Sequence, residues 1–295
     1  MATERIECPS GLILEVRNMK AREMALLADD GEEGEEDGGK RRVAKKVVKR
    51  KNPITGVLAG CTLEVVDVGP YEAYGAVAGT IARVENGVPI PGPGKLPWPE
   101  LLLADRFFAL TRIRACTWGD GFEFRVRCKD KTCEKHKKPF LWEIPLSELA
   151  IKELPESSRA MVREKNVVFE FELGGRKAKF KLQQGLDEGK GPDMGDIPKR
   201  EIFLAQCASR LIYVEGLDVS NFAKLLEWVG DLDLPEVLAA TSYYDEVDGG
   251  IETNTLAECP SCGLEFDVSV PFDGQSFLLP DKKTAALRQM AEPTA

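Results

Sequence analysis

The most informative part of the chain is residues 256–270, which read Leu-Ala-Glu-Cys-Pro-Ser-Cys-Gly-Leu-Glu-Phe-Asp-Val-Ser-Val. Two residues separate Cys259 from Cys262, and Gly263 follows the second cysteine. Apolar residues then alternate with polar ones, as in a half-buried strand, at Phe266, Val268 and Val270. The pattern is typical of a zinc knuckle, in which a turn between two strands presents both thiolates on one side and the glycine allows a close backbone approach.

A second cysteine pair occurs earlier in the chain and consists of Cys128 and Cys133, with four intervening residues. This pair also stands between two expected strands, over residues 122–126 and 140–144. His136, the only histidine, is three residues further on and is a possible substitute ligand. Two such knuckles can supply the four ligands of one structural zinc site, and we predict that zinc binds Cys128, Cys133, Cys259 and Cys262. The alternatives are two reduced turns without metal, or a redox-active pair, although the βαβ context of a thioredoxin-like site is missing.

The overall composition argues against an acid–base enzyme. The chain has 295 residues with one histidine and eight cysteines, and histidine is the commonest proton-transfer group near neutral pH. A closed four-cysteine site leaves no position for a substrate, so we expect no catalysis. The remaining cysteines are expected to be small buried hydrophobes or incidental thiols; they are Cys8, Cys61, Cys116 and Cys207.

Charge and hydropathy bear on partners and compartment. Forty Lys and Arg against 49 Asp and Glu give a net charge of −9, so we expect no general affinity for nucleic acid or anionic membranes. The N-terminus shows no secretory signal, and no apolar run is long enough to span a membrane. We therefore expect a reducing cytoplasm, where paired cysteines more often bind metal than form disulfides.

Hydrophobic periodicity predicts helices and strands in both halves of the chain. The clearest helix covers residues 103–113, with Leu103, Phe107, Leu110 and Ile113 on one face and Asp105 and Arg106 elsewhere. Strands are expected over residues 12–16, 167–173 and 177–182. Other helices are expected over residues 21–27, 54–66, 202–214, 218–229 and 234–244, with Asp218 as a possible N-cap. An insertion over residues 29–51 holds seven acids followed by eight bases.

Both halves end in the same order of strand, cysteine pair, strand, then proline and a large apolar residue. We predict an α+β fold of two related halves, each with helices plus β-hairpins that end in a cysteine knuckle, joined at a zinc-ribbon-like site. The first half covers residues 1–155, with the charged insertion 29–51 and the first knuckle. The second half covers residues 156–280, and residues 281–295 form a tail.

Several blocks of the chain, taken in order, resemble the T-even-type bacteriophage baseplate proteins, the hub-associated subunits of contractile-tailed phages. The blocks are residues 11–20 (GLILEVRNMK) with Glu23, 69–71 (GPY), 103–110 (LADRFFAL), 113–120, 142–149, 259–263 (CPSCG) and 271–273 (PFD). The chain departs from that family in its stretched, lysine-rich first knuckle and in the charged insertion.

The resemblance implies a structural or assembly protein of the tail baseplate, made in the cytoplasm of the host bacterium. It implies partners among the hub, tube and tape-measure proteins, and either a place in the virion tail or a role as an assembly chaperone. The alternative is a zinc-ribbon adaptor that binds nucleic acid through the basic segments 40–51 and 129–138.

Overall fold

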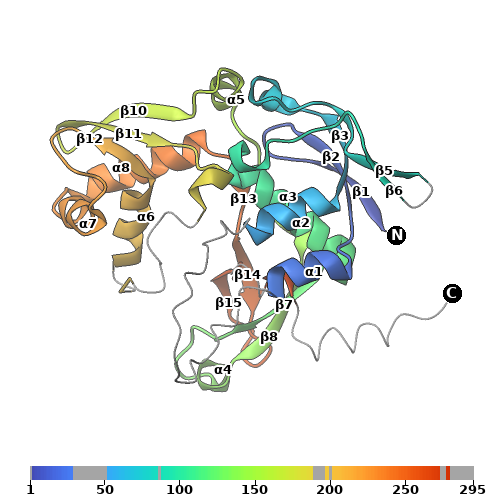
Figure 1. Cartoon of the computed structure of the whole chain (residues 1–295). Helices are drawn as coiled ribbons and strands as arrows, with labels where there is room; N and C mark the ends of the chain where they lie inside the picture. The colour runs from blue at the N-terminus through green and yellow to red at the C-terminus, as the bar shows by residue number, and fades with distance from the viewer. Residues whose placement is uncertain are drawn as a thin grey trace, which may run out of the picture.

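Helix α3 (Leu103–Trp118) lies at the centre of the molecule, with a β-sheet unit on either side and a pair of β-hairpins below (Figure 1). The structure, a computed structural model, describes residues 2–28, 52–85, 88–188, 197–198, 201–272 and 277–279. The predicted α+β class is confirmed. The insertion 29–51 and the tail 281–295 lie outside the described residues.

The N-terminal unit is an antiparallel sheet in the order β1-β2-β3-β4, with a further hairpin of β5 and β6. Its strands are β1 (Thr3–Glu7), β2 (Ile13–Arg17), β3 (Thr62–Asp67), β4 (Gly79–Thr80), β5 (Ala82–Glu85) and β6 (Val88–Pro91). Helices α1 (Ala21–Ala28) and α2 (Pro53–Cys61) pack against each other beside it. The Asn52 side chain caps α2 by accepting a hydrogen bond from the Ile54 amide at 2.9 Å. The predicted helix over residues 54–66 is wrong beyond Cys61, because the β-branched residues that follow pair with β2 instead.

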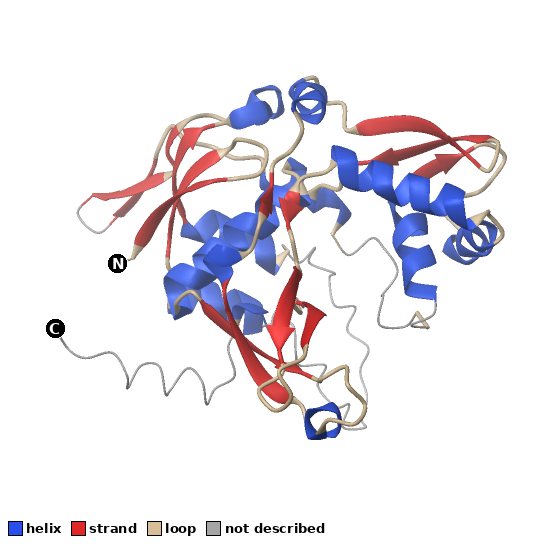
Figure 2. Ribbon diagram, turned by 180° about the vertical axis from the view of Figure 1, so that it is seen from behind, coloured by secondary structure: helices blue, strands red, loops and turns tan. Residues whose placement is uncertain are grey.

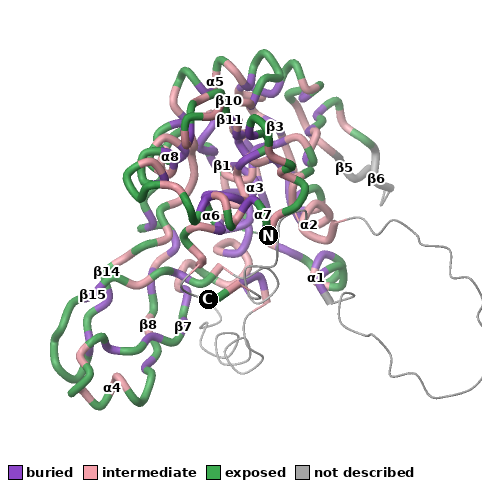
Figure 3. Tube along the Cα trace, turned by 90° about the vertical axis from the view of Figure 1, so that its left-hand side faces the viewer, coloured by how far each residue is buried: buried purple, intermediate pink, exposed green. Residues whose placement is uncertain are grey.

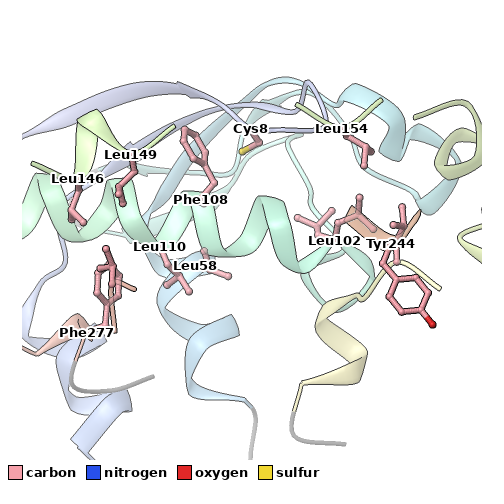
Figure 4. Close-up of a cluster of buried hydrophobic side chains, with 14 of the residues drawn as sticks. Cys8, Leu58, Leu102, Phe108, Leu110, Leu146, Leu149, Leu154, Tyr244 and Phe277 are labelled. Atoms are coloured by element: carbon pink, nitrogen blue, oxygen red, sulfur yellow. The ribbon is translucent and has the colours of Figure 1, made fainter. Parts of the chain in front are cut away.

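The prediction of one apolar face underestimates how much of α3 is buried, because other elements enclose the helix on most sides. Ile113 and Leu110 are buried as expected, but so are Phe108, Asp105 and Arg106. Figure 4 shows apolar side chains around the helix that come from distant segments, among them Leu58 of α2, Leu149 and Phe277. A helix at the centre of a core must bury its polar residues too, and each of these then needs hydrogen-bond partners.

The C-terminal unit is a three-stranded antiparallel sheet, β10-β11-β12, with aromatic packing against one of its helices. Its elements are α5 (Glu156–Arg163), β10 (Val168–Leu173), β11 (Arg176–Lys181), α6 (Ile202–Arg210), β12 (Leu211–Val214), α7 (Phe222–Gly230) and α8 (Leu234–Val247). The rings of Phe180 and Tyr244 lie 4.3 Å apart between sheet and helix. The helix predicted over residues 202–214 ends at Arg210, where the chain turns into β12. The cap of α7 is Asn221, which accepts from the Lys224 amide at 3.2 Å, and not the predicted Asp218.

Two hairpins project from the body of the molecule (Figure 2) and carry much of its exposed surface (Figure 3). One consists of β7 (Gly121–Val126) and β8 (Phe140–Pro145), with the short helix α4 (Glu134–Lys137) between them; the other consists of β14 (Asn254–Glu258) and β15 (Glu265–Ser269). Strands β9 (Ile151–Lys152) and β13 (Gly250–Ile251) join the two parts of the chain. Over the described residues the halves have different sheets, four strands against three, so their relatedness and the boundary at residue 155 stay predictions.

Candidate metal centre

The four predicted cysteines, Cys128, Cys133, Cys259 and Cys262, come together at the tips of the two hairpins. Their Sγ atoms all lie within 4.8 Å of one another. The Sγ–Sγ distance is 3.7 Å between Cys128 and Cys262, and also 3.7 Å between Cys133 and Cys259. Tetrahedral coordination with metal–sulfur bonds of about 2.3 Å places sulfur atoms about 3.8 Å apart. The four thiols therefore have the spacing of a tetrahedral ligand set and can hold one metal ion.

The knuckle after β14 has the backbone geometry that its sequence predicts. The Cys259 amide donates to the Leu264 carbonyl at 2.9 Å, and the Gly263 amide donates to the Cys259 carbonyl at 2.9 Å. Gly263 has a φ of 70°, in the left-handed region that favours glycine. Burial opposes ionisation of Cys259, but the backbone amides of Ser261 and Cys262 lower its pKa to about 7. The turn thus prepares Cys259 as a thiolate ligand.

The wider spacing of the first pair is taken up by a turn and the start of α4. The Asp130 carboxylate accepts from the Thr132 amide at 2.8 Å, and the Cys133 amide donates to the Asp130 carbonyl at 3.2 Å. The Cys128 amide donates to the Lys135 carbonyl at 3.2 Å, which closes the loop. With four intervening residues, the thiols of Cys128 and Cys133 therefore still reach the cluster that Cys259 and Cys262 reach with two.

His136 lies beside the cluster but is not one of its members. Its Nδ1 atom is 2.7 Å from the carbonyl oxygen of Cys128. This contact orients the imidazole along the backbone of the first knuckle. The structure therefore places four thiols, without the histidine, around the candidate site.

Burial and charge differ between the ligands. Cys128 and Cys259 are buried whereas Cys262 is exposed, so the centre lies at the edge of the hairpin lobe. Burial raises the pKa of Cys128 to about 12, so this thiol holds its proton until a cation displaces it. Exposed lysines surround the first knuckle and favour negative charge on the sulfurs; they are Lys129, Lys131, Lys137 and Lys138.

The other cysteines have no such grouping. Cys8, Cys61 and Cys207 are buried, as predicted, and Cys116 is partly buried. Burial raises the pKa of Cys61 to about 12, which keeps it a neutral thiol. Cys8, Cys61 and Cys207 pack as small buried groups, whereas the Cys116 thiol donates to the Glu4 carboxylate at 3.4 Å.

A buried polar cluster at the start of α3 was not predicted from the sequence. Asp105 accepts from the Ser10 amide at 3.0 Å and from the Tyr71 hydroxyl, which also accepts from the Leu102 amide at 3.2 Å. Burial raises the pKa of Asp105, although these hydrogen bonds oppose the rise. The next residue, Arg106, donates to both carboxylate oxygens of Glu188, at 3.0 and 2.8 Å. The clusters join the N-terminal sheet, α3 and the segment after β11.

No protein-family model, curated protein or solved structure matches the chain. Among the described residues, no helix is both long and apolar enough to cross a membrane. The site itself is a cluster of four cysteine thiols at the tips of two β-hairpins, close enough together to hold a metal ion.

Proposed function

We propose that Cys128, Cys133, Cys259 and Cys262 bind one zinc ion with a structural role. Four cysteine thiolates at tetrahedral spacing are the ligand set that structural zinc prefers. Bound there, the ion supplies a cross-link and negative-charge compensation, and no reaction is assigned to it. The apolar side chains of the two hairpins, among them Phe124 and Phe266, are part of the main core, and a metal ion at the hairpin tips would add a cross-link that stabilises this lobe.

We further propose that the protein is a non-catalytic assembly subunit of a contractile phage tail baseplate, made in the host cytoplasm and acting by protein–protein binding. The observation that carries this proposal is the ordered resemblance of its sequence blocks to the baseplate family. In the fold, two of these blocks meet: Tyr71 of the GPY block donates to Asp105 of the LADRFFAL block. Residues from separate blocks that join in one buried contact are what a shared core requires. Duplication of the two halves is part of the same proposal.

Binding of nucleic acid is the second candidate function, and one observation favours it: the exposed lysines of segment 129–138. The other basic segment, residues 40–51, lies outside the described residues. Aromatic side chains that stack on bases are a common feature of single-strand binding sites. Phe124 and Phe140 beside the knuckle are instead buried. We therefore place this function second.

Co-expression with tail proteins of the same genome tests the assembly proposal. The expected result is co-elution of the chain with a hub, tube or tape-measure protein in size-exclusion chromatography, without nucleic acid in the complex. Failure to associate with any of them, together with binding to a DNA or RNA oligonucleotide that weakens steeply with salt, would replace the proposal by the second function.

A further inference from the structure

Strands β7 and β15 each have one hydrogen-bonded neighbour within the described part of the chain. β7 pairs with β8, and β15 pairs with β14. At residues 124–126 of β7 and along β15, the other edge therefore presents backbone N–H and C=O groups that pair with no further strand of the described residues. Exposed strand edges of this kind are templates for a further strand.

A groove of about 300 Å³ lies between these two edges. Its walls include residues 124–127 of the first hairpin and residues 266–269 of the second. Successive side chains of a strand point to opposite faces of a sheet. Because consecutive residues of both strands line the groove, the groove runs along their edges and not over one face of either hairpin.

The groove is positively charged on one wall. Arg125, Arg127 and Lys129 line the β7 side, and Asp267 is the one acidic residue that lines the other side. Both arginines are exposed, and in the described ranges neither forms an ion pair. The chain as a whole has a net charge of −9, so this concentration of positive charge is local. An occupant with negative charge is the one that this wall favours.

We infer that the groove binds an extended, acidic segment of a partner protein, which adds as a β-strand to the free edges of β7 and β15. Main-chain hydrogen bonds to the unpaired edges would hold the segment, and alternate side chains would point in opposite directions. On one face, acidic side chains meet Arg125 and Arg127. On the other face, apolar side chains meet the side of the hairpins on which Phe124 and Phe266 are buried.

The four cysteines lie at one end of this groove. Cys128 comes two residues after the end of β7, and Cys262 comes three residues before the start of β15, so an ion shared by these thiols would tie the two walls of the groove together at that end. The inference therefore rests on the proposed zinc centre. The inferred peptide binding does not depend on the phage assembly role. If that role is correct, an acidic extended segment is the chemistry expected of one of the assembly partners.

Fluorescence anisotropy with labelled peptides tests the inference on the full-length, zinc-loaded protein. The probe is a peptide of about eight residues that alternates Glu and Val, long enough to span a typical strand. We expect saturable binding to the protein, and binding about tenfold weaker to the double variant Arg125→Glu, Arg127→Glu. The double variant Arg163→Glu, Lys224→Glu, at exposed positions of α5 and α7, changes the net charge by the same amount; it is the matched control and should bind as the unchanged protein does.

Two further probes separate strand addition from simple charge attraction. A peptide of the same charge with proline at every Val position has no backbone N–H at those positions, so it loses half of its main-chain donors and should bind more weakly. Equal binding of the proline peptide, or tighter binding of a single-stranded DNA oligonucleotide, would overturn the inference. Absence of peptide binding by protein that contains zinc would also overturn it, whereas zinc-free protein would contradict the metal proposal instead.

Discussion

The Sγ atoms of Cys128 and Cys262 lie 3.7 Å apart, although 134 positions separate the two residues in the sequence. A metal ion shared by these thiols closes a very long loop. Closing such a loop lowers the entropy of the unfolded chain and so stabilises the fold, as a disulfide does. The proposed zinc ion therefore has an architectural consequence well beyond the hairpin tips.

Replacing His136 tests whether the ligand set is four cysteines. We expect His136→Ala to retain about one zinc ion per chain, because the imidazole contacts the Cys128 carbonyl and stands outside the cluster. Elemental analysis of the purified variant gives the answer. Loss of zinc from this variant, with the fold intact by circular dichroism, would show that the histidine is a ligand.

Tyr71→Phe is expected to destabilise the protein by about 2 kcal/mol, because it removes a hydrogen-bond donor from the buried Asp105 carboxylate. Urea denaturation at neutral pH measures the change. Tyr74→Phe, at a partly exposed ring in the same segment, is the control and should change the free energy of unfolding by less. Equal effects from the two variants would contradict the role assigned to the Asp105 contact.

The buried Arg17–Glu23 ion pair, with a distance of 2.9 Å, predicts a particular acid sensitivity. Although burial opposes it, hydrogen bonds from Arg17 and Arg22 lower the pKa of Glu23 from 4.5 to about 2. Because the pKa is lower in the folded state, the stabilisation by Glu23 is complete above pH 4.5 and is lost as the pH falls towards 2.

Glu23→Gln removes this charge and leaves Arg17 buried without a counter-ion, at a cost of about 3 kcal/mol near neutral pH. The difference in stability between the variant and the unchanged protein should shrink as the pH falls from 4.5 to 2. Glu156→Gln, in an exposed pair with Arg163, is the control and should have little effect. A difference that stays constant over that pH range would refute the linkage to Glu23.

Short-range pattern was enough to predict the hairpins and the cysteine pairs that they carry. Alternation at Phe122, Phe124 and Val126 fixes β7, and the Gly174-Gly175 turn fixes the β10–β11 hairpin, because both signals are local. The meeting of the two cysteine pairs followed from the chemistry of a four-ligand ion. No other long-range contact had a comparable signal.

The sequence-based predictions were wrong at positions whose secondary structure or burial depends on tertiary contacts. Thr62 and Leu211 each follow a helix and enter a strand, because a neighbouring strand offers hydrogen bonds that local periodicity does not reveal. The helical periodicity places Asp105 and Arg106 away from the apolar face of α3 and does not predict that they are buried. Their burial depends on Ser10, Tyr71 and Glu188, partners remote in sequence.

The zinc content of the purified protein is the decisive measurement for the proposed metal centre. Inductively coupled plasma mass spectrometry should find about one zinc ion per chain in the unchanged protein and almost none in Cys259→Ser, with a lower melting temperature for that variant. Cys116→Ser, outside the cluster, should keep both the metal and the stability. Folded, equally stable protein without zinc, or the same zinc content in all three proteins, would contradict the account.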